Sequence, residues 1–224
     1  MSKLIFLPTI QASGTWFCIN LLRAHPAITY FSVLSDVDES KLDRNTSLVQ
    51  VHFGMTNFAP EESWDAEYKK KFAPIDIVEK WMKRADKVVV PVRDPLAALL
   101  SAYKRPHPLR PIVDGFVTLA GWPKENIFIF PIDLYLQKTP VERYGALCSL
   151  FDYLELSREG FLSDLADKWN FVNTMGRYEL KRFYDQGLFA NIRGHAPEVE
   201  YLMSKRDVLR PFLDAVGYGK LMWY

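Results

Sequence analysis

Short apolar runs of strand-forming size alternate along the chain with longer segments of helical periodicity. The run at residues 88–92 is almost purely β-branched, which is typical of strands covered on both faces of a parallel sheet. This alternation predicts an α/β fold with three α/β/α layers around a mostly parallel central sheet. The predicted strands are residues 4–7, 28–34, 47–53, 88–92 and 126–130, and the predicted helices are residues 16–22, 76–87, 96–104, 140–154 and 198–216.

Proline and small polar residues indicate where several of these elements begin or end. Pro8 is expected to close the first strand, and Ser13 or Thr15 to cap the helix that follows. Three prolines within residues 106–111 predict a loop, whereas residues 112–121 are too short and apolar to assign. Repeats and low-complexity tracts are absent from the sequence.

Length and composition suit a single globular domain over residues 1–224, with 49% hydrophobic and 25% charged residues. The 28 basic and 27 acidic residues leave a formal charge of +1, so nucleic acid and membrane surfaces are not expected partners. Cys18 and Cys148, the only two cysteines, lie in apolar helical patterns and are expected to be buried. No apolar run approaches the about eighteen residues of a membrane span, and we predict a cytoplasmic protein.

A polar loop at residues 9–15 joins the first strand to the first helix and contains Gly14. Free N–H groups at the start of such a helix, together with the helix dipole, favour phosphate. The same order of elements also occurs in α/β domains that bind nothing there, and one glycine is weaker than a full dinucleotide or nucleotide fingerprint. Both interpretations therefore stay open at this point.

Two further polar residues follow predicted strands. His52 closes the strand at residues 47–53, and Arg93 follows the strand at residues 88–92. Ligands of parallel sheets bind outside the carboxyl ends of the strands. The sequence therefore predicts one site that contains the Ser13–Thr15 loop, His52 and Arg93.

These stretches resemble the sulfotransferases that use 3′-phosphoadenosine 5′-phosphosulfate (PAPS). The family has a Pro-Lys-Ser-Gly-Thr loop after its first strand, and Ser13, Gly14 and Thr15 match the end of that motif. The resemblance implies a P-loop-like fold around a five-stranded parallel sheet, with the loop cradling the 5′-phosphosulfate. Trp16 is interpreted as a core residue or as a neighbour of the adenine. The residues implied at this part of the cofactor site are Gln11, Ala12, Ser13, Gly14, Thr15 and Trp16.

A second family motif is an arginine and proline followed by a serine eight residues beyond the arginine. Arg93, Pro95 and Ser101 reproduce that spacing. The resemblance implies that Arg93 and Ser101 bind the 3′-phosphate of PAPS. The family's C-terminal cofactor motif is matched by little more than a glycine, and it implies Arg177 as a further contact.

The resemblance also implies a chemistry, which is sulfuryl transfer to an acceptor hydroxyl or amine with His52 as the general base and without a metal. The acceptor is expected to be a small molecule, apolar or aromatic, or a carbohydrate. Its pocket is assigned to residues 54–75 and 105–123, which are rich in aromatic side chains. Homodimerisation is left open.

The loop departs from the family at one position, because Ala12 stands where the family has its lysine. Gln11 can donate only a neutral hydrogen bond there, and Lys104 or Arg105 are candidates to replace the missing charge. One alternative is therefore a PAPS-binding but catalytically impaired relative that acts through a partner. Another is a different P-loop enzyme, such as a small-molecule kinase, which would need a lysine in the loop and a magnesium-binding aspartate.

The remaining histidines and one acidic residue have simpler interpretations. His25 precedes a proline at a helix end and His107 lies among prolines, so both are predicted to be structural. Asp133 resembles a family position that serves structure, and it is not expected to take part in chemistry.

Overall fold

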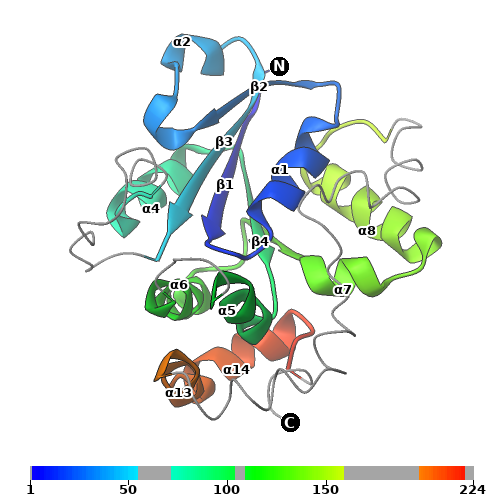
Figure 1. Cartoon of the computed structure of the whole chain (residues 1–224). Coiled ribbons are helices and arrows are strands. Elements are labelled where there is room, and N and C mark those ends of the chain that lie inside the picture. Colours follow the sequence, from blue (N-terminus) through cyan, green and yellow to red (C-terminus); the bar gives the residue numbers. More distant parts are fainter. Residues whose placement is uncertain (1, 55–71, 104–108, 159–196, 220–224) are drawn as a thin grey trace.

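The computed structural model describes residues 2–54, 72–103, 109–158 and 197–219. Its centre is a five-stranded sheet in the order β2-β3-β1-β4-β5, and every pairing is parallel (Figure 1). The predicted α/β architecture is therefore confirmed, and all the expected strands are present. The strands are β1 (Leu4–Ile10), β2 (Ile28–Val33), β3 (Thr46–Phe53), β4 (Lys87–Val92) and β5 (Ile127–Pro131).

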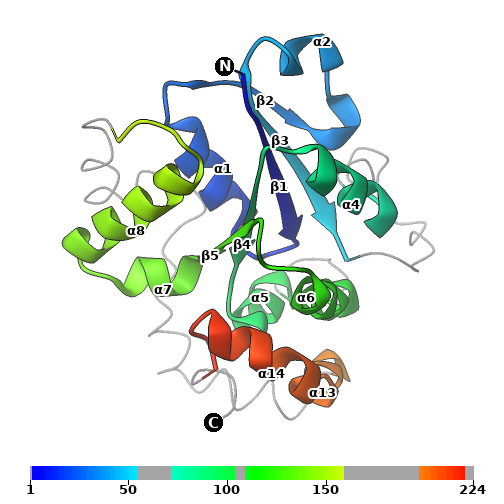
Figure 2. The same ribbon diagram turned by 180° about the vertical axis from the view of Figure 1, so that it is seen from behind.

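Helices cover both faces of the sheet. Helices α1 and α8 lie on one side and α4 on the other, and the two opposite views agree on this arrangement (Figures 1 and 2). No helix in the described ranges is long and apolar enough to cross a membrane. The helices are α1 (Thr15–Arg23), α2 (Glu39–Leu42), α4 (Ile75–Arg84), α5 (Pro95–Tyr103), α6 (Arg110–Gly121), α7 (Ile132–Gln137), α8 (Pro140–Tyr153), α13 (Pro197–Ser204) and α14 (Arg206–Ala215), with a 3-10 turn η1 (Leu34–Asp36).

Two hydrophobic cores flank the sheet, because successive side chains of a strand point to opposite faces. In β1, Ile5 and Leu7 belong to the core beneath α1 and α8, whereas Leu4 and Phe6 belong to the core beneath α4, α5 and α6. Burial of a side chain of this size contributes about 1.5–3 kcal/mol. The continuous apolar run of β1 thus supplies side chains to both hydrophobic cores.

Pro8 does not close the first strand, as the sequence suggested, because β1 continues to Ile10. Pro8 lies opposite Val51 of β3 in a register that runs without a break along the whole of β1. The pairing between β1 and β4 covers only Ile5 and Phe6. A proline beyond Phe6 therefore removes no donor from the β4 ladder, which is why it is tolerated inside a central strand.

The prediction of a loop at residues 106–111 is wrong at its end, since α6 begins at Arg110, and residues 106–108 lie outside the described residues. Pro111 lies in the first turn of α6, where a missing N–H costs nothing. Gly54, which follows the last residue of β3, has φ 106, and a Cβ there would lie 2.5 Å from the carbonyl oxygen of Pro111. Glycine at this position lets the end of β3 touch the start of α6.

The single helix predicted over residues 198–216 is two helices, α13 and α14, which break at Lys205. No glycine or proline marks the break. Both helices pack against α6, and their buried residues Leu202, Leu209 and Leu213 belong to the same hydrophobic core as the buried residues of α6. Tertiary packing overrides the local helical pattern at this point.

The two cysteines differ in their surroundings. Cys18 is fully buried in α1, as predicted, and burial raises the pKa of its thiol. Cys148 of α8 is only half-buried, so the expectation of burial is wrong for this residue. Both thiols are free.

Candidate functional site

The turn between β1 and α1 has two residues in the left-handed region, Ala12 (φ 60) and Gly14 (φ 88). Ser13 lies between them, and both its N–H (3.1 Å) and its hydroxyl (2.5 Å) donate to the carbonyl of Ile10. Ser13 therefore tightens the turn and does not cap the helix. Gly14 is the N-cap, and no side chain caps the first turn of α1.

The uncapped first turn of α1 contains a buried hydroxyl. The Thr15 Oγ1 atom has no hydrogen-bond partner among the described residues, although only 7% of the residue is exposed. A buried polar atom without a partner is uncommon and calls for an explanation. Together with the free N–H groups of the first helical turn, this hydroxyl forms a set of donors that an anion would satisfy.

The residues near Thr15 in the sequence differ in how far they are exposed to solvent. Trp16 is 52% exposed, so the interpretation as a core residue is wrong, whereas Gln11 is buried. Gly14 packs against α7, because a Cβ at this position would lie only 2.6 Å from Cδ1 of Ile132. The loop is thus fixed against the end of β5.

Arg93 leaves the end of β4 and is buried, with 3% exposure. Its Nε donates to Oδ1 of Asp133 over 2.9 Å, and the N–H of Asp94 donates to Oδ2 of the same carboxylate over 2.8 Å. The Tyr218 hydroxyl donates to the carbonyl of Val92 and accepts the N–H of Asp133. The C-terminal part of the described chain therefore helps to hold Arg93 in place, and Asp133 has the structural role that the sequence suggested.

A second carboxylate lies beside this ion pair. Asp94 directly precedes α5. Its Oδ1 accepts the N–H of Ala97, but its Oδ2 has no hydrogen-bond partner among the described residues. Burial raises the pKa of Asp94 to about 6, and the nearby charge of Asp133 adds to that shift. Burial also raises the pKa of Asp133, while Arg93 opposes the shift.

His52 is the second-last residue of β3, next to the loop. In the sheet register it lies opposite Thr9 of β1, and its Nδ1 is 2.9 Å from the Thr9 hydroxyl. Its ring packs against Phe72 with 5.1 Å between ring centroids. The imidazole is therefore held from two sides at the carboxyl edge of the sheet.

The structure brings the loop, His52 and Arg93 to the same edge, because β3, β1 and β4 are neighbours and run in parallel (Figure 1). Ser101 is half-buried in α5, the helix that starts after Arg93. Arg177 and His107 lie outside the described residues, as do Lys104 and Arg105 and most of the predicted acceptor segment 54–75.

Among solved structures, the chain is similar to a mouse sulfotransferase, SULT7A1, complexed with PAP. The TM-score is 0.55 at 14% sequence identity, and the match covers 98% of this chain and 87% of that chain. No protein-family model and no curated protein sequence matches the chain. The chain has a sulfotransferase-like fold. The expected P-loop-like arrangement of strands and helices is thereby confirmed at the level of the fold.

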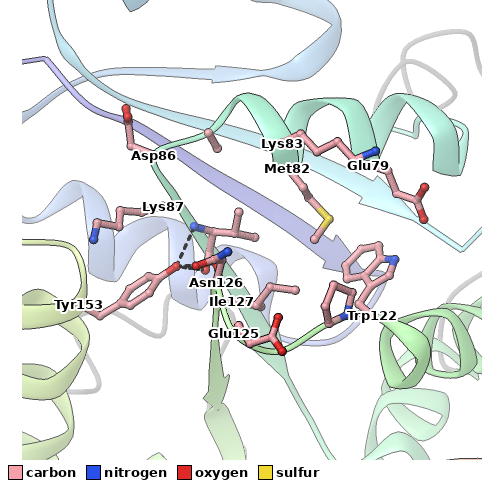
Figure 3. A pocket seen from close by; sticks show the side chains of 13 residues that line it. Glu79, Met82, Lys83, Asp86, Lys87, Trp122, Glu125, Asn126, Ile127 and Tyr153 are labelled. Carbon is pink, nitrogen blue, oxygen red and sulfur yellow. Dashed lines mark hydrogen bonds between the residues drawn. The ribbon is translucent and has the colours of Figure 1, made fainter.

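A cavity of about 490 Å³ lies elsewhere in this sulfotransferase-like fold (Figure 3). Its walls include Met82 and Lys83 of α4, Lys87 at the start of β4 and Tyr153 at the end of α8. These residues are at the amino ends of the strands, whereas the loop, His52 and Arg93 are at the carboxyl ends. The carboxyl edge is the candidate site, because open parallel sheets bind their ligands there.

Sequence reasoning missed three residues that shape the site, namely Thr9, Asp94 and Tyr218. The sequence predicted Thr9 to lie in the polar loop after the first strand, whereas it belongs to β1, and only the register with β3 brings it to His52. Asp94 follows Arg93 directly and precedes Pro95, a combination that could have indicated a helix N-cap. Nothing in the sequence connects Tyr218 to β4, from which 126 positions separate it.

Proposed function

We propose that the chain binds PAPS and its product adenosine 3′,5′-bisphosphate (PAP) and transfers the sulfuryl group to an acceptor hydroxyl or amine. The observation that carries this proposal is the buried, unpartnered hydroxyl of Thr15 at the uncapped start of α1. It lies in a chain whose fold is similar to that of a sulfotransferase complexed with PAP. The residues present fit a bound phosphosulfate, because they offer donors that nothing else in the described structure satisfies.

The binding roles follow from the donors at each position. The N–H groups at the start of α1 and the Thr15 hydroxyl would hold the 5′-phosphosulfate. Arg93 and Ser101 would hold the 3′-phosphate. Since one of its five N–H donors goes to Asp133, Arg93 forms a neutral pair that is fixed in direction. Its contribution would therefore be oriented hydrogen bonds and not a net positive charge.

The remaining arrangement supports the chemical step. PAPS supplies an activated sulfuryl group, whose bond to the phosphate oxygen breaks as a bond to the acceptor oxygen forms. The acceptor hydroxyl must lose its proton in this exchange, and His52 at the neighbouring strand end would accept it. Phe72 and the Thr9 hydroxyl orient the His52 ring for that role. The acceptor would bind between segments 54–75 and 105–123.

A second candidate function is PAPS or PAP binding without turnover, in which the chain acts through a partner. Ala12 favours it, because this residue offers only a methyl group at the position of the family's lysine. Its backbone is in the left-handed region and it is half-buried, so the loop keeps its shape without the lysine. Charge that develops on the leaving oxygen would then lack a cationic partner from this position.

Calorimetric titration with PAP tests the binding proposal. A hydrogen bond to a charged group contributes about 1.5–3 kcal/mol, so Thr15→Val should weaken PAP binding by about tenfold or more. Thr15→Ser, which keeps the hydroxyl, should bind nearly as well as the wild type. Lys83→Ala, at the opposite edge of the sheet, should leave binding unchanged.

Absence of PAP binding by the wild type, or equal affinity in Thr15→Val, would overturn the proposal. If PAP binds, labelled PAPS offered with phenols, sugars and amines separates the two candidate functions. Sulfuryl transfer to any of these acceptors, if it is lost in His52→Gln, supports the first candidate function, a sulfotransferase. Binding without transfer across the panel supports the second candidate.

A further inference from the structure

The Thr9 hydroxyl is at the centre of three polar contacts between β1 and β3. Its oxygen is 3.0 Å from the carbonyl of Val51, 3.0 Å from Nε2 of Gln50 and 2.9 Å from Nδ1 of His52. Thr9 is fully buried and Gln50 is 3% exposed. Water therefore does not compete for these bonds at the hydroxyl.

The chemistry of the four groups determines where each proton lies. A carbonyl oxygen can only accept and an amide nitrogen can only donate, so Thr9 donates its single proton to Val51 and accepts from Gln50. One lone pair of the hydroxyl is left for His52, whose Nδ1 must then donate. The opposite assignment, with Thr9 donating to His52, would leave two oxygen lone pairs facing each other over 3.0 Å.

We propose that Thr9 is a positioning residue that holds neutral His52 in the Nδ1–H tautomer, so that the lone pair is on Nε2. The catalytic meaning of this tautomer rests on the proposed function, in which His52 accepts the proton of the acceptor. The tautomer itself rests only on the contacts between β1 and β3. A proton from the acceptor then adds to Nε2, and the resulting imidazolium keeps its Nδ1–H bond to Thr9.

The other histidine in the described residues, His25, has the reverse arrangement. Its Nδ1 accepts the N–H of Ala27 over 3.0 Å, and its Nε2 lies 3.1 Å from the carbonyl of Ser157, to which it must donate. Neutral His25 is therefore the Nε2–H tautomer. The chain thus contains an internal reference with the opposite proton position.

Nitrogen-15 NMR of the histidine side chains reads the tautomers directly at about pH 8, where neutral imidazole prevails. The expected result is an Nδ1–H pattern for His52 and an Nε2–H pattern for His25. The variants His52→Gln and His25→Gln assign the two sets of signals. An Nε2–H pattern for His52, or an even mixture of its tautomers, would overturn the proposal.

Two substitutions of Thr9 test its part in this preference. In Thr9→Val the shape is kept but the acceptor is lost, so His52 should become a mixture of tautomers. Thr9→Ser should retain the Nδ1–H form. An unchanged Nδ1–H pattern in folded Thr9→Val would contradict the role of Thr9.

If sulfuryl transfer is detected, Thr9→Val should lower kcat by about tenfold, which is part of the roughly 10²–10⁴-fold that a positioned general base contributes. PAP affinity and the acceptor KM should change less than twofold, whereas Thr9→Ser should restore kcat. A fall in PAP affinity as large as the fall in kcat would indicate a general structural defect and would contradict a positioning role. The NMR pattern does not depend on activity, so it stands or falls separately from the proposed function.

Discussion

The guanidinium Nε of Arg93 donates to Oδ1 of Asp133 over 2.9 Å, and the two side chains are 4% and 0% exposed. Such a buried pair costs desolvation that its attraction only partly returns. The pair therefore serves to fix the guanidinium at the carboxyl edge of β4 more than to stabilise the fold. Removal of one partner, in contrast, takes the ion pair away from a charge that stays buried.

Asp133→Ala should lower the free energy of unfolding by about 3–5 kcal/mol, because Arg93 stays buried after it loses the carboxylate of this ion pair. The double variant Arg93→Met/Asp133→Leu should be closer to the wild type than either single change. Urea denaturation measures the free energy of unfolding of the single and double variants. Glu39→Ala, which breaks an exposed pair with Arg84, should change stability little. A double variant as unstable as the sum of the single ones would show that the two residues act independently.

Asp94 should make the fold more stable in mild acid than near neutrality. The carboxyl has an ordinary pKa of 3.8 when unfolded and about 6 when folded, so the folded chain binds this proton more tightly. The contribution is fully present below about pH 4 and is lost as the pH rises through 6. Asp94→Asn keeps the acceptor for the Ala97 N–H and should remove this pH dependence. At pH 7 the variant should therefore be more stable than the wild type by about 1–3 kcal/mol.

Denaturation of wild type and Asp94→Asn across this pH range gives the difference directly, and other titrating groups cancel in it. Asp43→Asn, at an exposed position, provides the control. A constant difference between the wild type and Asp94→Asn from pH 4 to 7 would contradict the raised pKa.

Gly14→Ala should destabilise the fold by about 1–2 kcal/mol or more, because φ 88 disfavours a side chain and the Cβ would meet Ile132. Thermal unfolding measures the loss. The double change Gly14→Ala/Ile132→Ala separates backbone strain from the collision. Gly145→Ala, in α8 with open space around the position, should instead stabilise by about 0.5–1 kcal/mol. Equal effects at the two glycines would refute the assigned conformation of the loop.

Ala12→Lys should strengthen PAP binding and, if the protein is a sulfotransferase, raise its rate of transfer. The new ammonium would place positive charge in the β1–α1 turn, and the backbone cost is already present because Ala12 has φ 60. Titration with PAP and initial rates with labelled PAPS measure the two effects. Ala27→Lys adds the same charge at the exposed start of β2 and should change neither. A loss of PAP affinity in Ala12→Lys would argue against phosphate binding at this turn.

Much of the fold could be predicted because each strand carries its own local signal. The β-branched run at residues 88–92 and the apolar run at 47–53 identify β4 and β3 almost to the residue. Errors arose where neighbouring elements decide the outcome. Pro8 is tolerated because β4 pairing ends at Phe6, and α13 separates from α14 because both pack on α6.

The edge at which the site lies was also predictable, since parallel strands bring their carboxyl ends together. The contacts within the site were not. The partner of Arg93 is 40 positions away and the Thr9 hydroxyl meets His52 across 43 positions, so neither pairing leaves a local pattern. Trp16 shows an error of another kind. Its aromatic side chain suggested a place in the core, but the residue is exposed.

The contact between Gly54 and Pro111 has a consequence for how acceptor preference could change in evolution. The two segments to which we assign the acceptor pocket, 54–75 and 105–123, touch through backbone at this point and at Gly115. Insertions or deletions elsewhere in either segment would alter the pocket without moving its common anchor. We expect homologues with different acceptors to vary in the lengths of these segments and to keep glycine at 54.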